Sequence, residues 1–164
     1  MAAGEGKRSA RTWTDMLLQA TKSFSEEMLG LDECPIQGSG PGPAEPGPGA
    51  YITLVGDTGS VQMGIISTQT GCKQLAGMLL GMEGDEIDEL GGADMVDAYG
   101  EIINVVAGIV KQLVNESDPS FHLGLPIFIN GQVCAMEHQQ SIVTDIQIGD
   151  VPVHLLVLTP DAIE

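Results

Sequence analysis

The segment from residue 95 to residue 115 constrains the fold of this chain more than any other. Its apolar residues recur around most of a helical cylinder, which is the pattern of a helix buried on several sides. At about 100° per residue, six polar or small positions fall within roughly 80° of one another. They are Asp97, Glu101, Asn104, Gly108, Lys111 and Asn115. The pattern therefore predicts a core helix with one narrow polar stripe.

The stripe allows two interpretations. Polar residues on an amphipathic helix usually form a solvated face with no further role. The other interpretation is a surface contacted by another molecule, because neighbouring polar groups such as Glu101 and Asn104 destabilise a helix that buries them without partners. Gly108 favours this second view, since glycine costs about 1 kcal/mol relative to alanine in a helix and suggests a close approach to the backbone. Tyr99 points to the opposite side and is expected in the core.

The rest of the chain alternates helical and strand patterns. We expect helices over residues 13–29 and 70–82, the second capped by Thr70 or Gln69, and a negative charge from Asp94 at the start of the stripe helix. We expect strands over residues 51–55, 61–68, 122–129, 142–148 and 151–158. Gly59 should supply a positive φ in the first hairpin. This order predicts an α+β fold, with a mainly antiparallel sheet and helices packed on one face.

The chain is one domain in length, with an unusual tract near its start. Residues 1–37 form an N-terminal segment with a helix, and residues 38–50 are so rich in glycine and proline that we expect a flexible loop without regular structure. Residues 51–164 form the remainder of the same domain. With 164 residues and 43% hydrophobic content, the chain can bury a core without disulfides or metals.

The charge distribution restricts the possible partners. The formal net charge is −17, and only two of the six basic residues, Lys73 and Lys111, follow position 22. An acidic body repels nucleic acid and anionic membranes, and it favours a partner with a basic patch. Solubility or a salty cytoplasm explains the acidic charge equally well. An acidic cluster over residues 83–89 is either a solvated loop or a feature that steers a basic surface toward the stripe.

Cysteine and histidine spacing indicates neither disulfides nor a metal site. The chain has three cysteines without CxxC spacing and three scattered histidines. The Gly-rich tract lacks the ending of a P-loop, and no G-x-S-x-G nucleophile motif occurs. No signal peptide pattern or apolar run of membrane-spanning length is present, so we expect a cytoplasmic protein.

Four residues, by their type and spacing, resemble the signature of the CheC/CheX/FliY phosphatases, which act on phosphorylated CheY. They are Asp97, Glu101, Asn104 and, about two dozen residues later, Pro126. The order of elements over roughly residues 50–160 is similar as well. CheC-type members carry two such helices and CheX-type members one. Here only Asn104 follows a glutamate by three residues, and Gly30 stands where the first helix would need its asparagine. The chain is therefore most similar to the CheX type.

The resemblance implies a hydrolase acting on the aspartyl phosphate of a CheY-like response regulator. Asn104 would orient the attacking water, and Glu101 would anchor the regulator's active-site lysine. Asp97 and Gly108 would shape docking, and Pro126 would hold the loop beside the helix. The chain would bind no cofactor of its own, because the regulator carries the Mg²⁺. CheX-type members extend a sheet across two subunits, which implies a homodimer.

Two other functions share this fold. A response-regulator-binding module would dock its partner without hydrolysis, and a flagellar-switch-type interaction protein would serve as a structural component. Pure docking would tolerate alanine, serine or lysine at position 104, so the asparagine favours the phosphatase.

Overall fold

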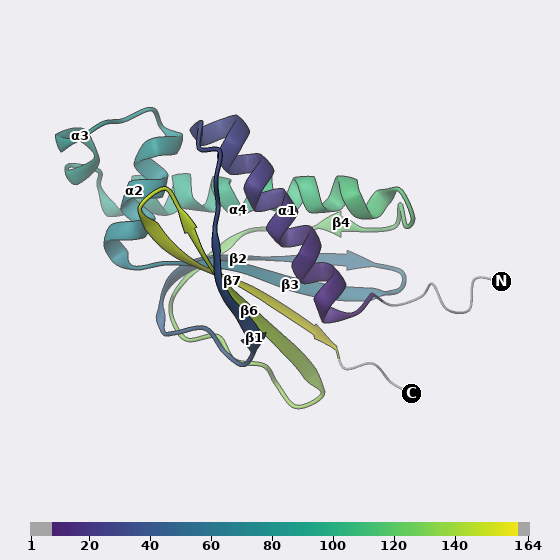
Figure 1. Ribbon diagram of the computed structural model, residues 1–164. Helices are drawn as coiled ribbons and strands as arrows, with labels where there is room; N and C mark the ends of the chain where they lie inside the picture. The colour runs from purple at the N-terminus through teal and green to yellow at the C-terminus, as the bar shows by residue number, and fades with distance from the viewer. Residues whose placement is uncertain (1–7, 161–164) are drawn as a thin grey trace.

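A computed structural model describes residues 8–160 of the chain. A seven-stranded antiparallel sheet forms one layer, with strand order β1-β6-β7-β3-β2-β4 and with β5 also paired to β2. The helices cover one face of this sheet (Figure 1). Along the chain the elements are α1 (Ala10–Leu29), β1 (Ile36–Pro41), β2 (Gly47–Gly56), β3 (Gly59–Ile66), α2 (Gln69–Leu79), α3 (Asp85–Asp88), α4 (Gly92–Asn115), β4 (His122–Leu123), β5 (Ile127–Gly131), β6 (Gln139–Ile148) and β7 (Val151–Pro160). The α+β class predicted from the sequence is confirmed.

Helix α1 begins and ends at residues suited to those positions. The Ser9 side chain caps its start by accepting a hydrogen bond from the Thr12 N–H. Gly30 ends it in a left-handed conformation with φ of 69°, and its N–H bonds the Ser25 carbonyl. Gly30 therefore has a structural role as the helix terminus.

The predicted hairpins are present. Strands β2 and β3 pair from Gly49 opposite Ile66 to Gly56 opposite Gly59, and Gly59 has a φ of 143°. Strands β6 and β7 pair along their whole length around Gly149, whose φ is 60°. The expected single strand over residues 122–129 is instead two, because Gly124, Leu125 and Pro126 separate β4 from β5.

The prediction that residues 38–50 lack regular structure is wrong, since only residues 42–46 lie outside strands. Strand β1 pairs with β6, and the start of β2 pairs with both β3 and β5. Glycine is suited to this part of β2, because a Cβ at Gly49 would lie 2.8 Å from Cγ1 of Ile66 and 3.0 Å from the Ile65 carbonyl oxygen. The Pro48 carbonyl accepts a hydrogen bond from the Ser67 N–H.

Helix α2 starts one residue earlier than predicted, and its cap is Thr68 rather than Thr70 or Gln69. The Thr68 hydroxyl accepts a hydrogen bond from the Gly71 N–H at 2.9 Å. Part of the acidic segment is the short helix α3, which packs against α2. A Cβ at Gly77 of α2 would lie 2.6 Å from Cγ1 of Ile87, so a larger residue there would push α3 away.

Helix α4 lies at the centre of the helical layer and contacts α1, α2 and β2. Its buried residues belong to one apolar core shared with the helix-facing side of the sheet. They are Met95, Ala98, Tyr99, Ile102, Ile103, Val106, Ala107, Val110 and Val114. Asp94 lies in the first turn, as predicted. The opposite face of the sheet carries a smaller apolar cluster around Tyr51, Ile66 and Leu156.

Candidate functional site

The polar stripe lies on the outer side of α4, opposite its buried face. Asp97 and Glu101 are exposed, and Asn104 and Gly108 are partly exposed. Lys111 and Asn115 continue the stripe and are also partly exposed. Within residues 8–160, Glu101 and Asn104 take part in no salt bridge or side-chain hydrogen bond, so their polar groups are free to meet another molecule.

The buried side of α4 holds the helix in a defined rotation. The Tyr99 hydroxyl donates a hydrogen bond to the Ile65 carbonyl at 3.0 Å. The Tyr99 ring packs edge-on against Phe128, with centroids 6.1 Å apart. Burial raises the pKa of Tyr99 well above its usual value, so the phenol stays protonated and keeps donating. Tyr99 is thus a core residue, as predicted, and its contacts turn the stripe outward.

Glycines stand one turn before and one turn after Asn104. A Cβ added at Gly100 or at Gly108 would meet no heavy atom within 4 Å. These glycines are therefore not required by packing inside the described chain, in contrast to Gly77. Each is unfavourable in a helix by about 1 kcal/mol relative to alanine. Gly100 is a position that the sequence analysis missed, although its spacing of four residues from Asn104 could have revealed it.

Pro126 lies on the connection between β4 and β5, at the edge of the sheet that adjoins α4. Its neighbour Leu125 is 87% exposed. Phe128, two residues after Pro126, packs its ring against Tyr99 and so anchors β5 to α4. The proline therefore precedes a strand that is fixed to the buried side of the stripe helix, while the other four predicted residues share the outer face of α4.

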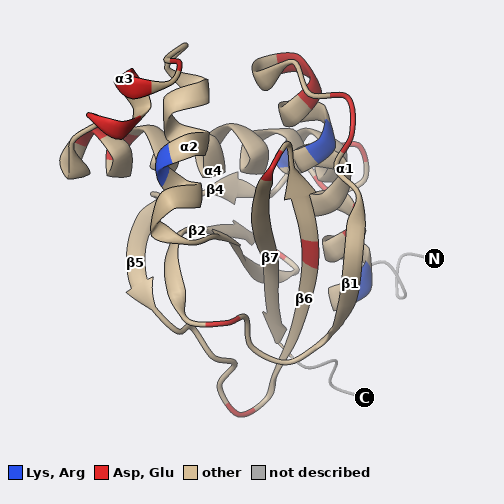
Figure 2. Ribbon diagram, turned by 60° about the vertical axis from the view of Figure 1, so that its left-hand side comes forward, with Lys and Arg blue, Asp and Glu red and all other residues tan. Residues whose placement is uncertain are grey.

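The acidic segment is held close to the beginning of α4. Figure 2 shows the acidic residues of α3, in red, on a segment that lies beside α2. The Lys73 ammonium donates a hydrogen bond to the Asp88 carbonyl at 2.6 Å, and Ile87 occupies the space over Gly77. These contacts give the acidic segment a defined position relative to the helical layer.

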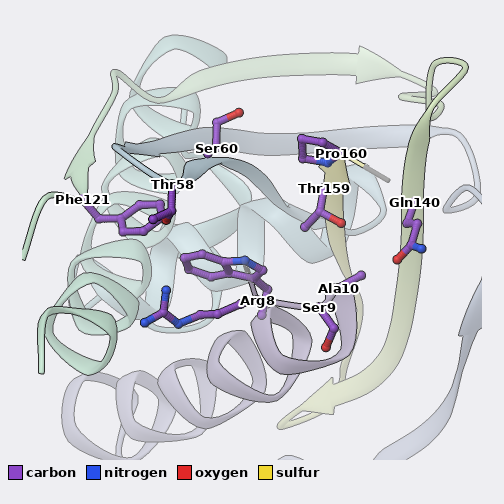
Figure 3. A pocket seen from close by; sticks show the side chains of 11 residues that line it. Arg8, Ser9, Ala10, Thr58, Ser60, Phe121, Gln140, Thr159 and Pro160 are labelled. Carbon is purple, nitrogen blue, oxygen red and sulfur yellow. The ribbon is translucent and has the colours of Figure 1, made fainter. Parts of the chain in front are cut away.

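The hollow shown in Figure 3 lies apart from the stripe. It has a volume of about 250 Å³ and lies between the start of α1, the β2–β3 turn and the end of β7. The Arg8 guanidinium is 5.7 Å from the Trp13 ring centroid and bonds the Ser117 hydroxyl. None of the predicted site residues lines this hollow. The candidate site is thus an open helix face, which suits a macromolecular partner better than a small ligand.

The cysteines offer no activated thiol in the core. All three are free, and Cys34 and Cys72 are buried. Burial raises the pKa of Cys72 to about 11, so its thiol is protonated at neutral pH. Within residues 8–160, no three His, Cys, Asp or Glu side chains are grouped so that they could hold a metal ion. No helix in that same range is long and apolar enough to cross a membrane.

The sheet, the helical layer and the outward stripe define a protein of the CheC/CheX type. The profile of the family described as "Chemotaxis phosphatase CheX" matches residues 48–147, which is more than half of the chain. This chain belongs to the CheX family. Comparison with curated protein sequences found no match.

Solved structures share the fold at low sequence identity. A chemotaxis protein CheX from Desulfovibrio desulfuricans is 15% identical, with a TM-score of 0.74 over 90% of this chain and 99% of that one. CheX in a CheX–CheY–BeF₃–Mg²⁺ complex from Borrelia burgdorferi is 16% identical, with a TM-score of 0.71 over 92% and 98%. The middle domain of FliM from H. pylori is 14% identical, with a TM-score of 0.63 over 92% and 88%.

Proposed function

We propose that this CheX-family protein hydrolyses the aspartyl phosphate of a CheY-type response regulator. The observation that carries the proposal is the outward position of Glu101 and Asn104, one turn apart on α4, with no partner among residues 8–160. A complex of a CheX of similar fold with CheY supports the choice of partner.

For this reaction the chain needs to supply only a group that orients the attacking water. In the hydrolysis, a water oxygen bonds to phosphorus, the acyl phosphate P–O bond breaks, and the regulator recovers its aspartate carboxylate. An amide offers a hydrogen-bond donor and an acceptor in one plane, so Asn104 can orient the water without changing its own protonation. The regulator supplies the Mg²⁺ that neutralises charge on the phosphoryl group.

Glu101 has a separate role in this proposal. Its carboxylate forms a charge-assisted hydrogen bond with the active-site lysine of the regulator, and this contact sets the register of docking. Asp97 and Gly108 belong to the same docking face, and Pro126 orders the neighbouring loop. We further propose that the protein acts in the cytoplasm as a homodimer.

A second candidate is a switch-type interaction protein without hydrolytic activity, because the FliM middle domain has a similar fold. The two candidates differ in one measurable outcome. The test is the time course of phosphate release from a Mg²⁺-loaded, phosphorylated CheY-type regulator with and without this protein. Faster release supports the phosphatase, and binding without acceleration supports the interaction protein.

A further inference from the structure

Lys111 is a positively charged residue of the stripe that has no ion-pair partner among residues 8–160. It is partly buried on the outer side of α4, two turns after Asn104. The salt bridges found within residues 8–160 involve histidines only, so no carboxylate pairs with Lys111 there. By contrast, Arg8 contacts two aromatic rings and Ser117, and Lys73 bonds the Asp88 carbonyl.

The position of Lys111 makes the stripe electrically polar along the helix. Asp97 and Glu101 are negative and precede Asn104, whereas Lys111 is positive and follows it. With a rise of about 1.5 Å per residue, Lys111 lies roughly 10 Å beyond Asn104 and roughly 15 Å beyond Glu101. Gly108 lies between them without a side chain, so a partner can follow the helix from one charge to the other.

Roles within the chain explain this lysine poorly. The last turn of α4 contains no basic residue, and Lys111 lies just before that turn. Its interaction with the helix dipole is therefore weak, because the dipole acts mainly within the last turn. Lys111 is only partly exposed, whereas Lys22 of α1 is exposed. In a chain with a net charge of −17, a lysine without a salt bridge among residues 8–160 and beside the candidate site is suited to contact an acidic group of a partner.

We propose that Lys111 forms an ion pair with a carboxylate on the docked response regulator. This inference rests on the proposed function and specifies the partner surface. That surface carries a cation opposite Glu101 and an acidic side chain roughly 15 Å away along α4, opposite Lys111. Two opposite charge pairs define which way the regulator lies along the helix, and reversing that direction would oppose like charges.

The test compares two substitutions with the same change in total charge. Lys111→Glu and the control Lys22→Glu, at an exposed position of α1, both make the protein more acidic. If the acidic body only steers a basic partner, both variants should bind as well as the parent or better. If Lys111 contacts a carboxylate, Lys111→Glu should weaken binding about tenfold or more, whereas Lys22→Glu should not.

Binding is measured with a Mg²⁺-loaded, beryllofluoride-activated CheY-type regulator, so that the readout does not depend on hydrolysis. We expect Lys111→Gln to weaken binding less than Lys111→Glu, and Lys111→Arg to retain most affinity. Unfolding curves check that each variant is folded. Equal affinity of Lys111→Glu and the parent, or equal losses in both charge variants, would overturn the Lys111 contact alone. Failure of the parent protein to bind any regulator would overturn the proposed function as well.

Discussion

Gly108 lies one turn after Asn104 on the outer side of α4, and a methyl group added at Gly108 would meet no heavy atom of the described residues within 4 Å beyond its chain neighbours and the adjacent backbone of the helix. The helix therefore gives up stability at this position without gaining internal packing. Docking of a partner over Asn104 supplies a reason, because a side chain there would separate the two surfaces.

Gly108→Ala should accordingly stabilise the protein and impair its function. We expect the free energy of unfolding to rise by up to about 1 kcal/mol, because alanine is the better helix former. Affinity for the activated regulator should fall. Gly92→Ala is the matched control, since Gly92 is also in α4 with open space but lies at its start. A Gly108→Ala variant that binds as tightly as the control would show that no close approach occurs.

Asn104→Ala should separate catalysis from binding. Loss of a group that acts mainly in the transition state typically lowers the rate by about 10² or more. We expect regulator binding and stability to remain close to those of the parent protein, and phosphate release to fall to nearly the rate of the regulator alone. Single-turnover release at saturating protein measures this step. Parental hydrolysis by the variant would remove Asn104 from the mechanism.

Glu101→Ala should weaken both docking and turnover. A charge-assisted contact that sets register acts in the ground state and in the transition state alike. Titration with the activated regulator and the phosphate-release assay together provide the measurement. Unchanged affinity with unchanged turnover would mean that Glu101 belongs only to a solvated helix face.

Salt should slow association more than it slows chemistry. Between about 50 and 500 mM salt, the screening length shrinks from more than about 10 Å to a few ångströms. If the acidic body steers a basic regulator, the association rate constant should fall across this range, while hydrolysis within the formed complex changes much less. Stopped-flow association at several salt concentrations tests the idea. A salt-independent association rate would leave the acidic surface as a matter of solubility.

Alkaline pH should destabilise the fold through Cys72. Burial raises the pKa of this thiol from 9.0 to about 11. A group whose pKa is raised in the folded state stabilises fully below its unfolded pKa, and this contribution is lost as the pH rises through the folded pKa. We therefore expect the free energy of unfolding to decline between about pH 9 and pH 11. Denaturant unfolding of the parent and of Cys72→Ala should show a shallower decline in the variant. Identical slopes would contradict the assignment to Cys72.

The sequence alone determined the helix that carries the candidate site. Its evidence is local, because the 3.6-residue period of Ile102, Val106 and Val110 needs no knowledge of distant residues. The same periodicity placed Tyr99 inside and Asn104 outside, and the structure agrees. The residue types at 97, 101, 104 and 126 likewise carried the resemblance to the CheX family, which the family profile confirmed.

Only the tertiary structure determines that much of the Gly/Pro-rich tract forms strands. Its composition predicts a loop, yet β1 becomes a strand because its residues pair with β6, as Ile36 does with Ile146. Gly49 fits a strand because Ile66 leaves no room for a Cβ. Such pairings join segments far apart in the chain, so no local pattern encodes them. The fold of the helical layer likewise decides the open space around Gly100 and Gly108. It also decides that Lys111 forms no salt bridge within residues 8–160. Both features depend on which neighbouring residues the fold brings close.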